Sequence, residues 1–262
     1  MISVSSAQLD AWLAAFMFPL ARILGLLAMA PVFNNAGLPT RIRLLIGLAI
    51  AFALAPALPP MPAIPAGSWL GLTVLAQQTL IGVLIGFTLR IVFSAVDIAG
   101  ELIGLQMGLS FAIFYDPQNA GQTPVLSEFL GLLTTLMFLA MNGHLLALSV
   151  LAESFQLLPV SATPFSAQSF HAVVSSAATV FAAGLLLSLP LIAALLITNI
   201  AMGVLSRVAP QLNLFAVGFP VTMIAGFTVL MISMPYFGAA LERLFDQGFV
   251  ALRTVTQAAG AA

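Results

Sequence analysis

The sequence contains no cysteine, no lysine and few charged residues of any kind. Charged residues make up 6% of the 262 residues, and the formal net charge is −1. Soluble domains carry about 25% charged residues, so this chain has too few charges to cover a water-facing surface. The absence of cysteine excludes disulfides, thiolate zinc sites and cysteine nucleophiles. The balanced charge provides no basic patch for nucleic acid.

Apolar residues account for 61% of the chain and gather in long uninterrupted stretches. A helix that spans a bilayer needs roughly 20 of them in a row. Six stretches reach or approach that length: Trp12–Ala30, Ile42–Leu58, Trp69–Val96, Phe129–Leu151, Ala177–Gly203 and Leu214–Phe237. The sequence therefore predicts an all-α, polytopic membrane-inserted protein, with Pro190, Pro220 and Pro235 kinking or breaking its last two helices.

The third apolar stretch is too long for a simple span. Nothing breaks it firmly between Trp69 and about Gly108. About forty helical residues extend roughly 60 Å, which is twice the thickness of the hydrocarbon core. Arg90, Asp97 and Glu101 fall on one face of this helix. We predict a buried charged face against a protein neighbour or a water-filled path. The alternative is that Asp97 and Glu101 mark the end of the span in water.

The same helix carries glycines at four-residue spacing. They are Gly82 and Gly86, followed by Gly100, Gly104 and Gly108. Residues four apart share a helix face, and a face of glycines lets a second backbone approach closely. The pattern predicts close helix packing, either within the chain or against a partner subunit.

The segment after this helix combines methionine and phenylalanine with a turn. It runs from Met107 to Pro117 and ends on Asp116-Pro117, where proline forces the preceding residue out of the helical region. Soft and aromatic side chains can pack into a conformable seal. The alternative is a re-entrant or interfacial segment anchored by Tyr115.

Motifs of the common enzymes are missing from the sequence. There is no His-Glu-x-x-His, no Gly-x-Ser-x-Gly and no glycine-rich phosphate loop with lysine. We therefore predict no catalytic residues, no cofactor and no metal site. Residue chemistry alone keeps one alternative among non-enzymes: a small-solute secondary transporter that uses the charged face and the proline-interrupted helices.

Several short motifs, in their order and spacing, resemble one known family. They are Pro39–Arg43, Gly104–Phe111, Asp116-Pro117, Asn142-Gly143-His144, Pro159 and, most specific, Arg207–Pro220. Together they resemble the FliR-like export-gate family, which belongs to the export apparatus of type III secretion. The resemblance covers nearly the whole chain.

The resemblance implies an architecture and a set of partners. Residues 1–262 would form one export-gate domain of long kinked helices, with a FliP-like part over about 1–175 fused to a FliQ-like hairpin and tail over about 176–262. Such proteins assemble with FliP and FliQ into a channel, with FlhB docked on it and FlhA nearby. Unfolded flagellar proteins pass through the channel. The complex belongs to the flagellar basal body at the bacterial inner membrane, in contact with lipid and with much of it on the periplasmic side.

The resemblance also implies site residues. A plug would lie at about 106–122, with side chains from Met107, Phe111, Ile113, Phe114 and Tyr115. A cytoplasm-facing loop would carry Arg207, Gln211 and Asn213. The positive-inside rule agrees with that side of the membrane.

Overall fold

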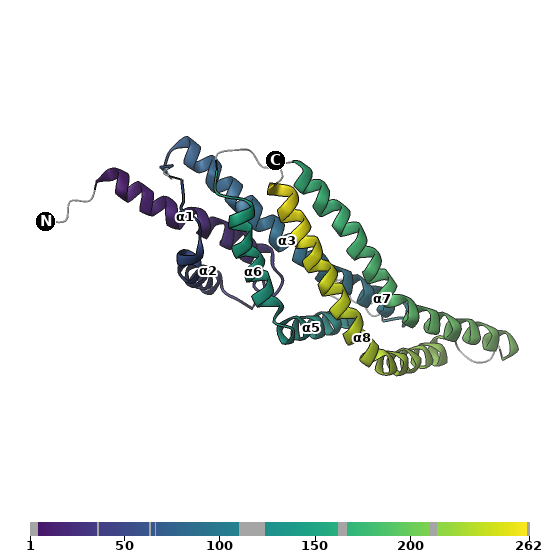
Figure 1. Ribbon diagram of the computed structural model, residues 1–262. Coiled ribbons are helices and arrows are strands. Elements are labelled where there is room, and N and C mark those ends of the chain that lie inside the picture. The colour runs from purple at the N-terminus through teal and green to yellow at the C-terminus, as the bar shows by residue number, and fades with distance from the viewer. Residues whose placement is uncertain are drawn as a thin grey trace. The chain divides into compact units, whose positions relative to one another are not determined.

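The computed structural model describes residues 5–35, 37–62, 64–65, 67–109, 124–161, 167–209 and 214–260, and the regular secondary structure in these ranges is entirely helical (Figure 1). The described residues form seven α-helices and one short 3₁₀ turn, η1, at Ala55–Ala57. The α-helices are α1 Ser6–Met29, α2 Thr40–Leu54, α3 Trp69–Gln106, α5 Val125–Ala140, α6 Gly143–Leu157, α7 Ala167–Val208 and α8 Leu214–Gly260. The predicted all-α architecture is confirmed for these residues.

Local signals account for several helix boundaries. Ser5 and Gln8 form a reciprocal capping box at the start of α1. Ser68 caps α3 by accepting a hydrogen bond at Oγ from the Gly71 backbone N–H, 3.0 Å away. From there α3 runs for 38 residues, close to the length predicted from its unbroken apolar sequence.

The fourth apolar stretch is built from two helices that bend by 65° at a short break, and together they are long and apolar enough to cross a membrane. Helix α5 ends at Ala140 and α6 begins at Gly143. Between them, Asn142 adopts a left-handed conformation with φ of 56°. Asparagine tolerates that conformation better than most residues, and it stops the helix despite the apolar surroundings. Five other described helices, α1, α3, α7, α8 and α2 with its short extension, are long and apolar enough to cross a membrane.

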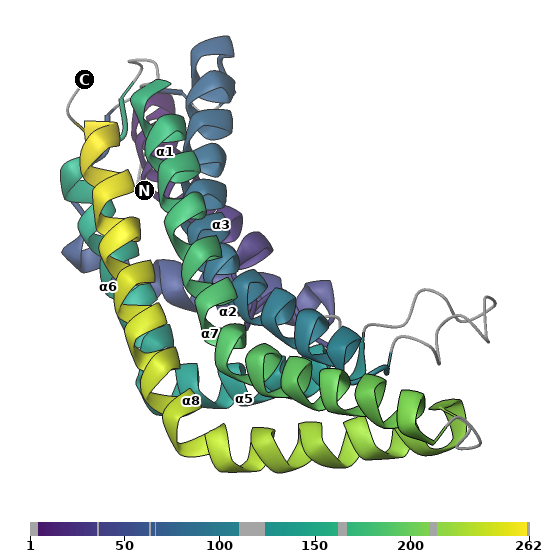
Figure 2. The same cartoon turned by 90° about the vertical axis from the view of Figure 1, so that its right-hand side faces the viewer.

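Helices α7 and α8 are longer than the apolar stretches that predict them. They contain 42 and 47 residues, and their helical hydrogen bonding continues past Pro190, Pro220 and Pro235. Each proline removes one backbone donor, but none of the three ends its helix. The C-terminal part of α7 and the N-terminal part of α8 lie side by side (Figure 2), and Gly218 approaches the Met202 side chain there.

The chain divides into two compact units, and both are discontinuous in sequence. The first combines Met1–Ile91, Asn142–Ala178 and Gln247–Ala262. Its core is built on fully buried side chains of α1 and α6, including Phe18, Leu27 and Phe155.

The second unit combines Val92–Met141 and Thr179–Asp246. Three rings from α3, α5 and α8 meet in its core. The centroid of Phe93 is 5.6 Å from those of Phe138 and Phe245, which are 5.3 Å from each other. These units describe packing, and the division at about 175 stays a prediction about the two parts of the fold.

Candidate functional site

The end of α3 has a defined hydrogen-bonded cap, and this cap overlaps the start of the segment predicted as a plug. Gly108 has φ of 80°, in the left-handed region. Its N–H donates to the Leu105 carbonyl at 3.1 Å, while the Leu109 N–H donates to the Gly104 carbonyl at 3.0 Å. This pair of bonds is a Schellman motif, which closes a helix and sets the direction of the chain beyond it.

Met107, the last residue before this cap glycine, packs inside the chain. Its side chain is 0% exposed. A Cβ built on Gly226 of α8 would lie 2.6–2.8 Å from Met107 Cγ, Cε and Sδ. The Thr222 hydroxyl, one turn earlier in α8, lies 3.4 Å from the Met107 carbonyl oxygen. We expected Met107 among the plugging side chains, and that role stays a prediction; in the isolated chain its side chain packs against α8. Phe111, Ile113, Phe114 and Tyr115 lie outside the described residues.

The five glycines predicted to allow close packing differ in what they contact. A side chain at Gly82 would overlap the Arg22 carbonyl of α1, and one at Gly86 would lie 2.6 Å from the Leu26 carbonyl oxygen. At Gly100 it would meet the Ser127 Cα at 2.6 Å. These three glycines therefore give other helices of the chain close access to α3. A side chain at Gly104 would make only an ordinary contact, and Gly108 acts as a cap after the helix.

The charged residues of α3 are exposed on the isolated chain. The side chains of Arg90, Asp97 and Glu101 are all exposed. The chain itself therefore does not bury this charged face, and its predicted burial would need another subunit. Next to it, the Asp97 carbonyl oxygen accepts a hydrogen bond from Ser127 Oγ at 2.7 Å, which joins α5 to α3.

The predicted cytoplasm-facing loop is described only at its first residue. Arg207 is exposed in the last turn of α7. A cation there interacts favourably with the negative end of the helix dipole. Gln211 and Asn213 lie outside the described residues.

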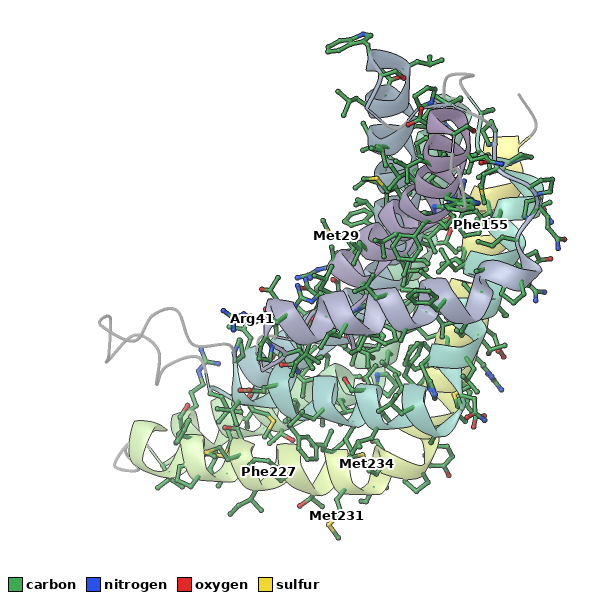
Figure 3. The ribbon with its side chains drawn as sticks, turned by 90° about the vertical axis from the view of Figure 1, so that its left-hand side faces the viewer. Met29, Arg41, Phe155, Phe227, Met231 and Met234 are labelled. Carbon is green, nitrogen blue, oxygen red and sulfur yellow. The ribbon has the colours of Figure 1, made fainter. Side chains whose placement is uncertain are left out.

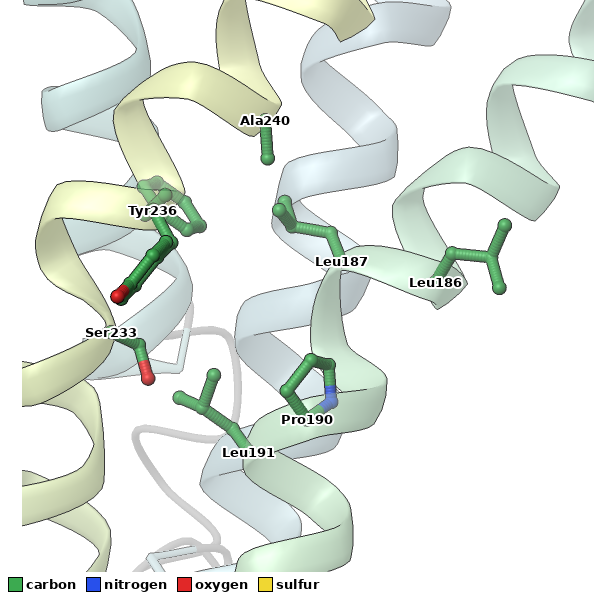
Figure 4. Close-up of a pocket in the computed structure, with 8 residues that line it drawn as sticks. Leu186, Leu187, Pro190, Leu191, Ser233, Tyr236 and Ala240 are labelled. Atoms are coloured by element: carbon green, nitrogen blue, oxygen red, sulfur yellow. The ribbon is translucent and has the colours of Figure 1, made fainter.

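A cavity of about 270 Å³ lies between α7 and α8 near two of the prolines (Figure 4). Pro190 and Leu191 of α7 face Ser233 and Tyr236 of α8 across it. No charged side chain lines it. Within the described ranges, no group of three histidine or acidic residues is placed to hold a metal ion.

A buried arginine is the main polar feature that sequence reasoning missed. Arg22 of α1 is 0% exposed. It donates from Nε to Gln78 Oε1 at 2.8 Å, and from Nη1 to the Ser154 carbonyl and hydroxyl at 2.9 and 3.0 Å. The signal was available: a single ionisable residue stands inside an apolar span, where it is costly without partners.

The comparisons with known proteins cover almost all of the chain. Residues 13–248 match the family model described as bacterial export proteins, family 1. The chain belongs to this family. It is 41% identical to the flagellar biosynthetic protein FliR of Escherichia coli (strain K12) over 249 residues, 95% of each chain.

Relatives in other bacteria extend this result. The chain is 42% identical to the flagellar biosynthetic protein FliR of Pectobacterium carotovorum subsp. carotovorum, again over 95% of each chain. It is 27% identical to the FliR of Bacillus subtilis (strain 168), over 94% of this chain and 96% of the relative. The family resemblance predicted from the motifs is confirmed.

Proposed function

We propose that this chain is a non-enzymatic subunit of the flagellar protein export apparatus and helps to form and close the channel for unfolded flagellar proteins. The observation that carries the proposal is its family membership over nearly the whole length, with relatives named as flagellar biosynthetic proteins. The protein is membrane-embedded, as its long apolar helices require.

The surface of the long helices supports assembly with other subunits. At 1.5 Å per residue, α7 and α8 measure about 60 to 70 Å along their bent paths (Figure 2), twice the thickness of the hydrocarbon core. Large apolar side chains are exposed along both helices, including Ile197, Val208 and Met231. Phe227 and Met231 project outward from α8 (Figure 3). Exposed apolar surface beyond the reach of lipid needs other protein to cover it.

The family suggests which proteins cover it. We propose FliP and FliQ as the direct neighbours in a hetero-oligomeric channel, with FlhB docked on that complex and FlhA nearby. Much of the complex would then lie on the periplasmic side of the inner membrane. Mass analysis of the intact complex that contains this chain tests the proposal. A stable monomer or homodimer, with none of these partners, would contradict it.

We propose that residues about 106–122 plug the closed channel. Phe111, Ile113, Phe114 and Tyr115 supply bulky apolar groups that can seal a pore against water. Deleting Ile113 to Gln118 should leave the complex assembled but permeable to small ions and solutes. The measurement is uptake of a membrane-impermeant solute by cells, normalised to the amount of assembled complex. An assembled deletion variant that stays fully tight would exclude the plug.

A small-solute transporter is the weaker candidate. The relatives are named flagellar biosynthetic proteins, not solute transporters. The cavity between α7 and α8 also lacks charged lining residues for a coupling ion.

A further inference from the structure

We propose that the contact between Met107 and the Thr222–Gly226 face of α8 is a positioning contact that keeps the closed channel tight. It acts by fixing the point at which the plug segment begins. The inference rests on the proposed plug role of residues about 106–122.

The first support is the fit between Met107 and Gly226. Met107 is fully buried, and three of its side-chain atoms occupy the space that a Cβ at position 226 would need. Only glycine at 226 leaves room for the methionine in this position. Thr222 and Gly226 are four residues apart, so they belong to one face of α8, and both are buried.

The second support is a backbone contact one turn away. The Thr222 hydroxyl lies 3.4 Å from the Met107 carbonyl oxygen and 3.0 Å from the Phe219 carbonyl oxygen of its own helix. Its single proton is shared between two acceptors, so the bond to Met107 is weak. The packing of the methionine side chain therefore carries most of the contact.

The third support is the short sequence distance between this contact and the predicted plugging residues. Gly108 and Leu109 are held by the two Schellman hydrogen bonds, and the next predicted plugging residue after Met107 is Phe111. Only Ser110 stands between Leu109 and Phe111 in the sequence. Helix α8 therefore holds the plug segment at its start, although α8 lies more than a hundred residues further along the chain.

The test compares size changes on the two sides of the contact in the complete export complex. Met107→Ala removes most of the methionine side chain. Gly226→Val places a new side chain in the space that the methionine occupies. Each single variant should raise uptake of a membrane-impermeant solute about tenfold, equivalent to about 1.4 kcal/mol of lost bias toward the plugged state. The double variant has the same total number of side-chain heavy atoms as the native pair and should return uptake toward the native level.

Two controls make the result specific. Gly238→Val changes the same helix at a glycine whose added Cβ would meet nothing within 4 Å, and it should stay tight. Gly226→Ala raises the helix propensity of α8 yet still displaces Met107, so it replaces Gly226→Val if that variant assembles poorly. Uptake is normalised to assembled complex throughout.

The deletion of Ile113 to Gln118 separates the hypothesis of the plug from the hypothesis of the positioning contact. If the deletion leaks while both single variants stay tight in assembled complexes, the positioning contact is excluded and the plug remains. A double variant that leaks as much as the two singles combined also excludes the contact. If the deletion itself stays tight, the plug fails, and the positioning role fails with it.

Discussion

The guanidinium of Arg22 in α1 lies 4.1 Å from the centroid of the Phe155 ring in α6. Both side chains are fully buried. The five N–H groups of Arg22 are all used: Nε and one Nη2 proton go to Gln78 Oε1, both Nη1 protons go to Ser154, and the second Nη2 proton goes to the Leu158 carbonyl at 2.8 Å. Each acceptor is neutral. One cation thus connects α1, α3 and the end of α6 within the first unit.

Replacing Arg22 by lysine should destabilise the protein by about 3 kcal/mol, because hydrogen bonds to charged groups each contribute about 1.5–3 kcal/mol. Lysine keeps the charge but has three donors and no planar fork, so it cannot reach Gln78, Ser154 and Leu158 together. The measurement is the unfolding midpoint of the purified protein in detergent.

Arg243→Lys is the matched control, since Arg243 is exposed on α8. Its midpoint should stay near the native value because exposed charges contribute little to stability. Equal midpoints for the Arg22 and Arg243 variants would show that the guanidinium geometry is unimportant.

Gly82→Ala should separate α1 from α3. The new Cβ would overlap the Arg22 carbonyl, which belongs to a helix backbone and cannot rotate away. Overpacking of this kind typically costs about 1–3 kcal/mol. Gly203→Ala is the counterpart, because its Cβ would meet nothing within 4 Å. That variant should be neutral or slightly stabilised, and a Gly82→Ala protein that unfolds at the same temperature would contradict the close approach.

Phe245→Ala should destabilise the second unit strongly. The ring packs against Phe93 and Phe138, and removing a buried phenylalanine costs about 3–5 kcal/mol. Phe245→Leu retains most of the apolar volume and should lose far less. Thermal unfolding of both variants in detergent measures the difference. If the two variants lose the same stability, the aromatic cluster is not what holds α3, α5 and α8 together.

The sequence predicts the helices better than their ends or contacts. Uninterrupted apolar runs predict α1, α2 and α3, because the length and periodicity of an apolar run indicate a helix. The break at Asn142 depends on one left-handed residue in an apolar stretch, and composition cannot show it. The continuation of α7 and α8 past their prolines is a tertiary effect, since neighbouring helices hold these segments in place.

In the candidate site, too, the sequence predicts some features and not others. Four-residue spacing correctly directs attention to the glycines of α3, but spacing cannot distinguish the close approach at Gly100 from the cap at Gly108. The partner of Met107 lies more than a hundred residues away in α8. Such a contact is a property of the fold, and no local pattern around Met107 indicates it.

The outward face of α8 should be covered by other subunits in the assembled complex. Met231 is 80% exposed on the isolated chain, and Ile224 and Phe227 are exposed near it. The native chain has no cysteine, so Met231→Cys introduces a single thiol. We expect a membrane-permeable maleimide to label this thiol in the isolated chain and to label it much more slowly in the intact complex. Met107→Cys, buried within the chain, should react slowly in both states. Equally fast labelling of position 231 in both states would instead mean that no neighbouring subunit covers this face, and that the subunits bind elsewhere on the chain.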